Sequence, residues 1–108
     1  MAIDVRSRLN ISDEQLAEFC RKWKIARLEL FGSALRDDFG DDSDIDLLVT
    51  FDEPPKSLFD LVDMDLEIAR LAGRHVDLVE RRAVEEAENY LKRRRILGSA
   101  REIYRLND

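Results

Sequence analysis

Cysteine is almost missing from this chain of 108 residues, in which Cys20 is the single example. One thiol cannot form an intrachain disulfide, so the disulfide-rich secreted scaffolds are excluded and a reducing compartment is expected. Long apolar runs are missing too. Residues 1–10 contain no signal-peptide core, and no segment is long enough to span a bilayer. The sequence therefore predicts a cytoplasmic protein that does not interact with a membrane.

Positive charge is scarce, because 18 Lys and Arg residues stand against 24 Asp and Glu residues and leave a net charge of −6. Nonspecific binding to a phosphate backbone needs clustered Lys and Arg, so direct binding to nucleic acid is not expected. A nucleotide ligand is not excluded, since bound cations can reverse the local sign of the charge. With 44% hydrophobic and 39% charged residues, the composition is that of a globular protein. The length fits a single domain over residues 1–108.

The spacing of apolar residues predicts helices and strands in alternation. Ser12 and Gln15 form a capping-box pattern, and the helix that follows should bury Cys20 as a core residue. Further helices are expected over 33–38, from Ser57 to Gly73, and from about Glu85 to a break at Gly98. Strands are expected over 25–31, 46–51 and 75–80.

The last residues allow two interpretations. Ser99 with Glu102 could cap a short final helix, or Ile103 and Tyr104 could be extended. In either case, the order of elements predicts an α/β (α+β) domain, with a small mixed sheet of about three strands flanked by helices.

Aspartate is concentrated in one segment, where six of the ten residues from Asp37 to Asp46 are aspartate. Asp44 and Asp46 stand two apart at the start of a predicted strand, so their side chains should point to the same face. Like charges this close repel each other, and aspartate is a poor strand former. A hard divalent cation resolves the conflict, because magnesium prefers carboxylate and phosphate oxygens. The other aspartates of the segment are interpreted as turn residues.

A second group of candidate residues surrounds this pair. Gly32 and Ser33 stand at a predicted turn from strand to helix, where glycine permits close approach of the backbone and free N–H groups point at an anion. The Ser33 hydroxyl can donate to the same phosphate. A third carboxylate, Asp77, lies in an otherwise apolar strand that could lie beside the first two aspartates. Carboxylates for a metal and a Gly–Ser phosphate cradle are the groups that nucleotidyl transfer needs.

Three other polar features have simpler interpretations. His75 is predicted to be a structural or surface histidine rather than a catalytic base. Asp63 and Asp65 lie within a helical pattern and are interpreted as a solvated face. The run 92–95 of Lys and Arg is interpreted as a solvated helix end, which could also face an acidic partner.

The combined pattern resembles a known family. Gly32-Ser33, ten further residues, and Asp44-x-Asp46 followed by Leu-Leu-Val resemble the signature of the polymerase-beta-type nucleotidyltransferases. The short length and the position of Arg36 resemble the minimal nucleotidyltransferase (MNT) branch. The resemblance covers about residues 28–80 and is weaker over 91–104.

This resemblance implies the nucleotidyltransferase fold and a set of site residues. Asp44, Asp46 and Asp77 would be the catalytic carboxylates that bind two magnesium ions. Gly32, Ser33 and Arg36 would hold the triphosphate of ATP.

The resemblance also implies a partner, because many MNT proteins are antitoxins paired with a HEPN-domain ribonuclease toxin, and some transfer AMP to a toxin tyrosine. The implied function is magnesium-dependent transfer of AMP from ATP to such a hydroxyl. Two alternatives remain open. One is a non-catalytic antitoxin that neutralises its partner by binding alone. The other is a small-molecule nucleotidyltransferase that forms its acceptor site across a homodimer.

Overall fold

The two strands with the most continuous burial lie at the centre of a four-stranded sheet. In the computed structural model, which describes residues 4–106, the strand order is β3-β2-β1-β4. β1 (Ile25–Phe31) pairs antiparallel with β2 (Ile45–Phe51) and with β4 (Arg101–Arg105), whereas β2 and β3 (Val76–Glu80) run in parallel. A parallel pair needs a crossover, which α2 (Leu58–Ala72) supplies between β2 and β3.

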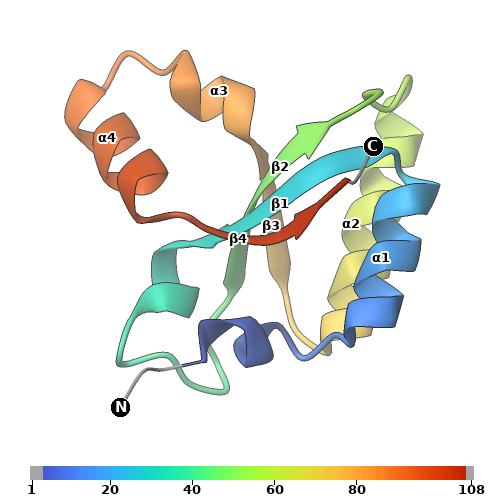
Figure 1. The fold of residues 1–108 in the computed structure, drawn as a ribbon, viewed down its shortest axis with the longest axis horizontal. Coiled ribbons are helices and arrows are strands. Elements are labelled where there is room, and N and C mark those ends of the chain that lie inside the picture. Colours follow the sequence, from blue (N-terminus) through green and yellow to red (C-terminus); the bar gives the residue numbers. More distant parts are fainter. Residues whose placement is uncertain (1–3, 107–108) are drawn as a thin grey trace.

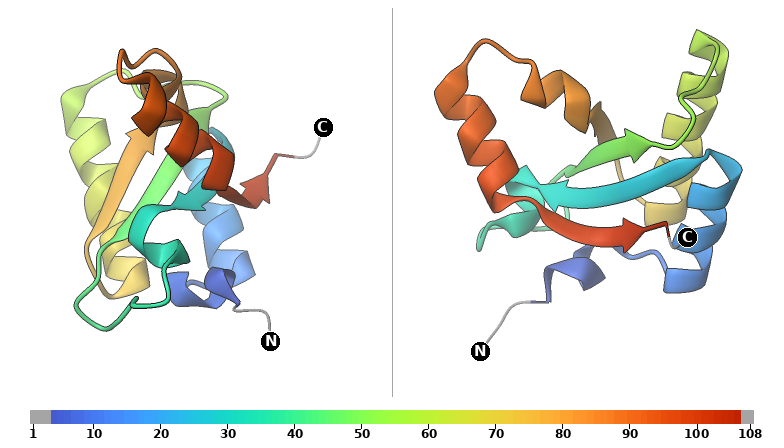
Figure 2. Two further views of the ribbon diagram at one scale, coloured as in Figure 1. Left: turned by 90° about the vertical axis from the view of Figure 1, so that its left-hand side faces the viewer. Right: turned by 45° about the horizontal axis from the view of Figure 1, so that its top comes forward.

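Helices lie on both faces of this sheet (Figures 1 and 2). α1 (Asp13–Lys22) and α2 lie on one side, and α3 (Arg81–Glu85) and α4 (Tyr90–Ser99) lie on the other. Short 3₁₀ helices occupy Val5–Leu9 and Gly32–Leu35. No helix within residues 4–106 has both the length and the apolar character needed to cross a membrane.

The main core lies between the sheet and the α1–α2 layer. It contains Phe19 and Cys20 of α1 and Met64 and Ile68 of α2. β1, β2 and β3 contribute the side chains that face these helices, including Leu28 of β1. Burial raises the pKa of the Cys20 thiol to about 12, so this cysteine packs as a small apolar residue, as predicted.

The helix boundaries on this side follow the predicted capping residues. The Ser12 hydroxyl accepts a hydrogen bond from the Gln15 amide at 3.1 Å, and the Gln15 side chain accepts one from the Ser12 amide at 3.2 Å. Ser57 caps α2, and Gly73 ends it with a left-handed φ of +73°. The predicted helix boundaries at Ser12, Ser57 and Gly73 are confirmed.

A smaller core lies on the opposite face of the sheet. Phe31 of β1, Leu48 of β2 and Val84 of α3 form its centre, and Ile96 and Leu97 of α4 pack against it. β1 and β2 are therefore buried on both faces, which explains their nearly continuous apolar sequence.

The C-terminal half differs from the prediction in two ways. The sheet has four strands rather than about three, because residues 101–105 form β4, the extended alternative, and Leu28 pairs with Tyr104. The helix predicted from Glu85 to Gly98 is instead two helices. Glu85 ends α3, and Asn89 caps α4 by accepting a hydrogen bond from the Lys92 amide at 3.0 Å.

The predictions of a helix end at Gly98 and of a short helix over 33–38 were also wrong. Gly98 does not stop α4, which runs on to Ser99 while Ile96 and Leu97 hold its inner face on the smaller core. In place of the helix expected over 33–38, only the 3₁₀ turn Gly32–Leu35 forms, and Arg36 is extended with φ −93° and ψ 153°. Tertiary packing outweighs local helix propensity at both places.

Candidate active site

The three predicted carboxylates come together at one end of the sheet. Asp46 lies in β2, Asp77 lies opposite it in the parallel register with β3, and Asp44 precedes β2 by one residue. Because side chains alternate along a strand, Asp44 and Asp46 point to the same face of the sheet as Leu48. Leu48 lies further along β2 and packs in the smaller core with Val84 of α3. The side chains of Asp44 and Asp77 are about half exposed, at 55% and 50%.

Asp46 shows how unfavourable this cluster is without a cation. Partial burial raises the pKa of its carboxyl first, and the negative charges of Asp77 and Asp44 raise it further. A hydrogen bond donated by the Ser33 amide acts in the opposite direction. A partly buried carboxylate between two others is the donor set that a hard divalent cation stabilises, so these residues fit magnesium.

The Gly32–Ser33 turn holds the cluster from the neighbouring strand end. Gly32 has a φ of +66°, and a β-carbon at this position would overlap the Oδ2 atom of Asp46. The Ser33 hydroxyl donates to the carbonyl of Asp44 at 2.7 Å. The backbone approaches a carboxylate here, which the sequence did not indicate. Contact of this turn with a phosphate stays a prediction.

Arg36 stands apart from the carboxylates. Its guanidinium pairs with Asp38 at 3.2 Å, and this is its one ion pair among residues 4–106. Its carbonyl accepts a hydrogen bond from the guanidinium of Arg8 at 2.6 Å, which fixes the backbone. The side chain is 68% exposed, so it is free to turn toward a ligand.

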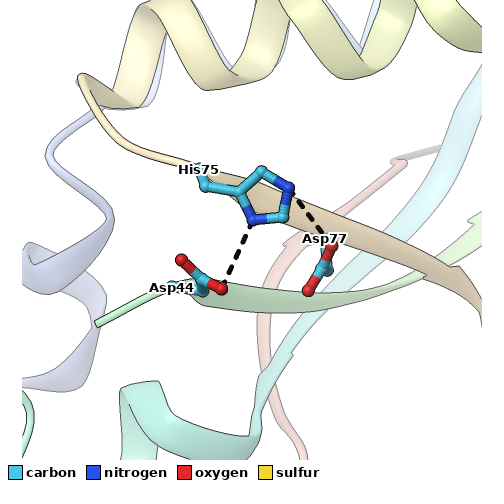
Figure 3. Close-up of side chains that lie close together, drawn as sticks. All are labelled: Asp44, His75 and Asp77. Atoms are coloured by element: carbon cyan, nitrogen blue, oxygen red, sulfur yellow. Dashed lines mark ion pairs between the residues drawn. The ribbon is translucent and has the colours of Figure 1, made fainter. Parts of the chain in front are cut away.

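His75 is the site residue that the sequence analysis missed. Its Nδ1 lies 3.5 Å from Oδ2 of Asp44, and its Nε2 lies 3.5 Å from Oδ1 of Asp77 (Figure 3). Ligand atoms of these three residues all lie within 4.8 Å of one another. The available signal was its spacing, since a residue two before Asp77 on an extended strand projects on the same side.

α2 borders the site through one further carboxylate. Asp65 is exposed, as predicted for a solvated face. Burial raises the pKa of its carboxyl first, the charge of Asp77 raises it further, and the charge of His75 lowers it. Asp65 therefore interacts electrostatically with two residues of the site, although α2 covers the opposite face of the sheet.

Carboxylates on two neighbouring strands, next to a Gly–Ser turn at the end of a third, are the arrangement of groups that nucleotidyl transfer needs. The sequence profile of the nucleotidyltransferase domain family matches residues 12–103, so the chain belongs to that family. The predicted fold and the predicted family are both confirmed.

Two individual relatives are similar to parts of this chain. Protein adenylyltransferase MntA of Thermococcus cleftensis is 33% identical over 76 residues, which are 70% of this chain and 73% of that protein. A Methanocaldococcus jannaschii protein that bears a protein adenylyltransferase name is 41% identical over 58 residues, or 54% of this chain. The chain spans 61% of the length of that relative.

Solved structures share the fold. One described as a minimal nucleotidyltransferase is 32% identical, with a TM-score of 0.60 and with 84% of this chain and 86% of the other covered. A toxin–antitoxin structure with AMP-PNP has a TM-score of 0.64 at 18% identity, with 90% and 76% covered. At that identity, the second comparison shows likeness of fold alone.

Proposed function

We propose that this chain is a magnesium-dependent nucleotidyltransferase that transfers AMP from ATP to a hydroxyl group of a partner protein. The cluster of Asp44, Asp46 and Asp77 beside the Gly32 turn is the observation that carries the proposal. The name of the Thermococcus relative supports protein as the acceptor, and the AMP-PNP in a structure of similar fold supports ATP as the donor.

The proposed reaction is an in-line displacement. The acceptor oxygen forms a bond to the α-phosphorus of ATP, the bond from that phosphorus to the bridging oxygen breaks, and pyrophosphate leaves. Bound magnesium ions supply positive charge for the triphosphate and the leaving group. Asp44 and Asp46 hold that charge in place. Asp77 accepts the proton of the attacking hydroxyl, since it is half exposed and lies at the edge of the cluster.

Ser33 and Arg36, which are proposed to hold the triphosphate, each contact another residue of this chain and would give up that contact for the ligand. The Ser33 hydroxyl would leave the Asp44 carbonyl for a phosphate oxygen, and Arg36 would leave Asp38. Gly32 keeps the turn close to Asp46, so phosphates held at the turn would lie next to the carboxylates that would hold the metal.

The proposed acceptor is a tyrosine of a HEPN-type toxin, and the biological role is that of an antitoxin. Structures with this fold have been solved as MntA–HepT toxin–antitoxin complexes, with a TM-score of 0.55 at 18% identity in one case.

The test combines this chain, the product of the neighbouring gene, magnesium and labelled ATP, and it locates the label by mass spectrometry. We expect AMP on a partner tyrosine. Asp77→Asn should abolish the label and leave the complex intact, since Asp77 is half exposed and not part of the core. An inhibited, unlabelled partner would show a binding module instead and would overturn the proposal. Label on a small molecule, made only by a homodimer, would also overturn it.

A further inference from the structure

The outward side of α2 carries a stripe of large apolar side chains. Leu58, Phe59, Val62 and Leu66 are 78%, 83%, 54% and 63% exposed. These four residues are called here the outer face of α2. Val62 lies three or four residues from each of the other three, so together they cover one side of the helix. The inner side of α2 is already packed, with Met64 and Ile68 buried in the main core.

This stripe is not required by the fold of the chain. Four large apolar side chains on one helix side form a patch of the kind that marks an interaction site. Leu91 offers a contrast, because Tyr90 is the one other exposed large apolar residue within α4 (Tyr90–Ser99).

The outer face of α2 and the carboxylate cluster lie on opposite sides of the sheet. α2 covers the face of β2 that buries Leu47, whereas Asp46 shares the other face with Leu48. β3 is an edge strand of the sheet, and α2 packs on it. Asp65 lies beside the stripe, and its carboxyl interacts with the charge of Asp77 on this edge strand. A partner docked on α2 would therefore reach the cluster by passing round the β3 edge.

Charge distinguishes between possible occupants. Asp63 and Asp65 flank the stripe, Asp60 lies at its N-terminal end, and Arg70 is the one basic residue of α2. A second copy of this chain would bring the same acidic flanks and the same net charge of −6. The flanks are complementary to an apolar helix side bordered by Lys and Arg.

We propose that the outer face of α2 docks the protein acceptor through an apolar helix flanked by Lys and Arg. The word acceptor rests on the proposed function, whereas docking itself requires neither nucleotide nor metal. The two proposals can therefore fail separately.

The experiment uses two fluorescent synthetic peptides of about five helical turns with the same leucine side. One has Lys flanks and the other has Glu flanks, and binding to the whole chain is measured by fluorescence anisotropy in EDTA. We expect the Lys peptide to bind at least about tenfold more tightly than the Glu peptide. Leu66→Lys should weaken binding of the Lys peptide by at least about tenfold. The matched control Leu91→Lys adds the same charge to another exposed leucine and should bind like the wild type.

The remaining outcomes each overturn the docking proposal. They are no binding of the Lys peptide, equal binding of both peptides, or equal loss in Leu91→Lys and Leu66→Lys. A dimer in analytical ultracentrifugation that Leu66→Lys dissociates would assign this face to a second copy instead. Asp77→Asn should bind the Lys peptide normally and lose AMP transfer. A wild-type chain that binds the Lys peptide but transfers no AMP to a partner would contradict the proposed reaction alone.

Discussion

A β-carbon at position 32 would occupy the space of the Oδ2 atom of Asp46. Gly32 also has a left-handed φ of +66°, which side-chain-bearing residues rarely adopt. Position 32 is thus restricted twice, by its own backbone and by the carboxylate that the turn approaches.

Gly32→Ala should therefore damage both stability and the site. The left-handed φ alone costs about 1 kcal/mol, and displacement of Asp46 adds to it. Gly73→Ala is the matched control, because Gly73 has a φ of +73° with no atom within 4 Å of the added carbon. We expect urea unfolding to show a loss in both variants, and calorimetry to show weaker magnesium–ATP binding only in Gly32→Ala. Equal binding in the two variants would contradict the role given to Asp46.

The double variant Asp44→Asn, Asp46→Asn tests the metal site directly. Removing two carboxylates should weaken magnesium–ATP binding by at least about tenfold in calorimetry. In EDTA at pH 7, the variant should unfold at a higher temperature than the wild type, because the ionised form of Asp46 is disfavoured in the folded state and its pKa is raised. Unchanged affinity would exclude these residues as the metal ligands.

Ser33→Ala tests the proposed phosphate contact. Loss of a hydrogen bond to a charged phosphate should weaken ATP binding by about 1–3 kcal/mol. The hydroxyl also holds the Asp44 carbonyl at 2.7 Å, so a smaller loss of folding stability is expected. Ser43→Ala is the control, since that hydroxyl accepts a hydrogen bond from Gly40 in the same loop at 3.0 Å. If both variants weaken ATP binding equally, the effect comes from the loop and not from a phosphate contact.

The sequence predicted the carboxylate cluster because strand periodicity is local information. Two residues of spacing place Asp44 and Asp46 on one face, and the β2–α2–β3 crossover then brings Asp77 alongside. The same spacing relates His75 to Asp77, but the sequence analysis interpreted His75 as a structural or surface histidine and so missed its contacts with two carboxylates.

The C-terminal elements were predicted less well for a related reason. Residues 101–105 form a strand by pairing with β1, which lies more than 70 positions away in the sequence. Local propensity does not encode a pairing over that separation. The break between α3 and α4 has a local signal that the sequence analysis did not use, since Asn89 caps α4 by accepting a hydrogen bond from the Lys92 amide.

His75→Gln tests whether the imidazole takes part in metal binding. Imidazole nitrogen suits zinc and nickel better than magnesium, so the loss should fall on the softer ions. Calorimetry should show nickel binding weakened by about tenfold or more and magnesium binding nearly unchanged. Asp77→Asn is the comparison and should weaken both ions, because its oxygens serve either. Equal effects of His75→Gln on the two ions would show that His75 is only a charge neighbour of Asp44 and Asp77.

The last prediction concerns a buried ion pair that joins α3 to the centre of the sheet. The Glu29 side chain is 8% exposed, and Nη1 of Arg81 lies 2.6 and 2.7 Å from its two carboxylate oxygens. Arg27 lies 3.3 Å from one of these oxygens but makes no hydrogen bond through its Nε atom. Arg81 directly follows β3, the strand that carries Asp77. This ion pair therefore links the end of β3 to β1, across the intervening strand β2.

Arg81→Met should therefore cost about 3 kcal/mol in urea unfolding, because it leaves a buried carboxylate with Arg27 as its remaining partner. The double variant Glu29→Leu, Arg81→Met should recover much of that loss, since no charge remains buried without a partner. Arg82→Met is the matched control. Its pair with Glu86 is exposed, at 81% and 66%, and such pairs contribute less than about 1 kcal/mol. If Arg81→Met and Arg82→Met unfold at the same urea concentration, burial adds nothing to the Glu29 pair, and α3 is held by Val84 alone.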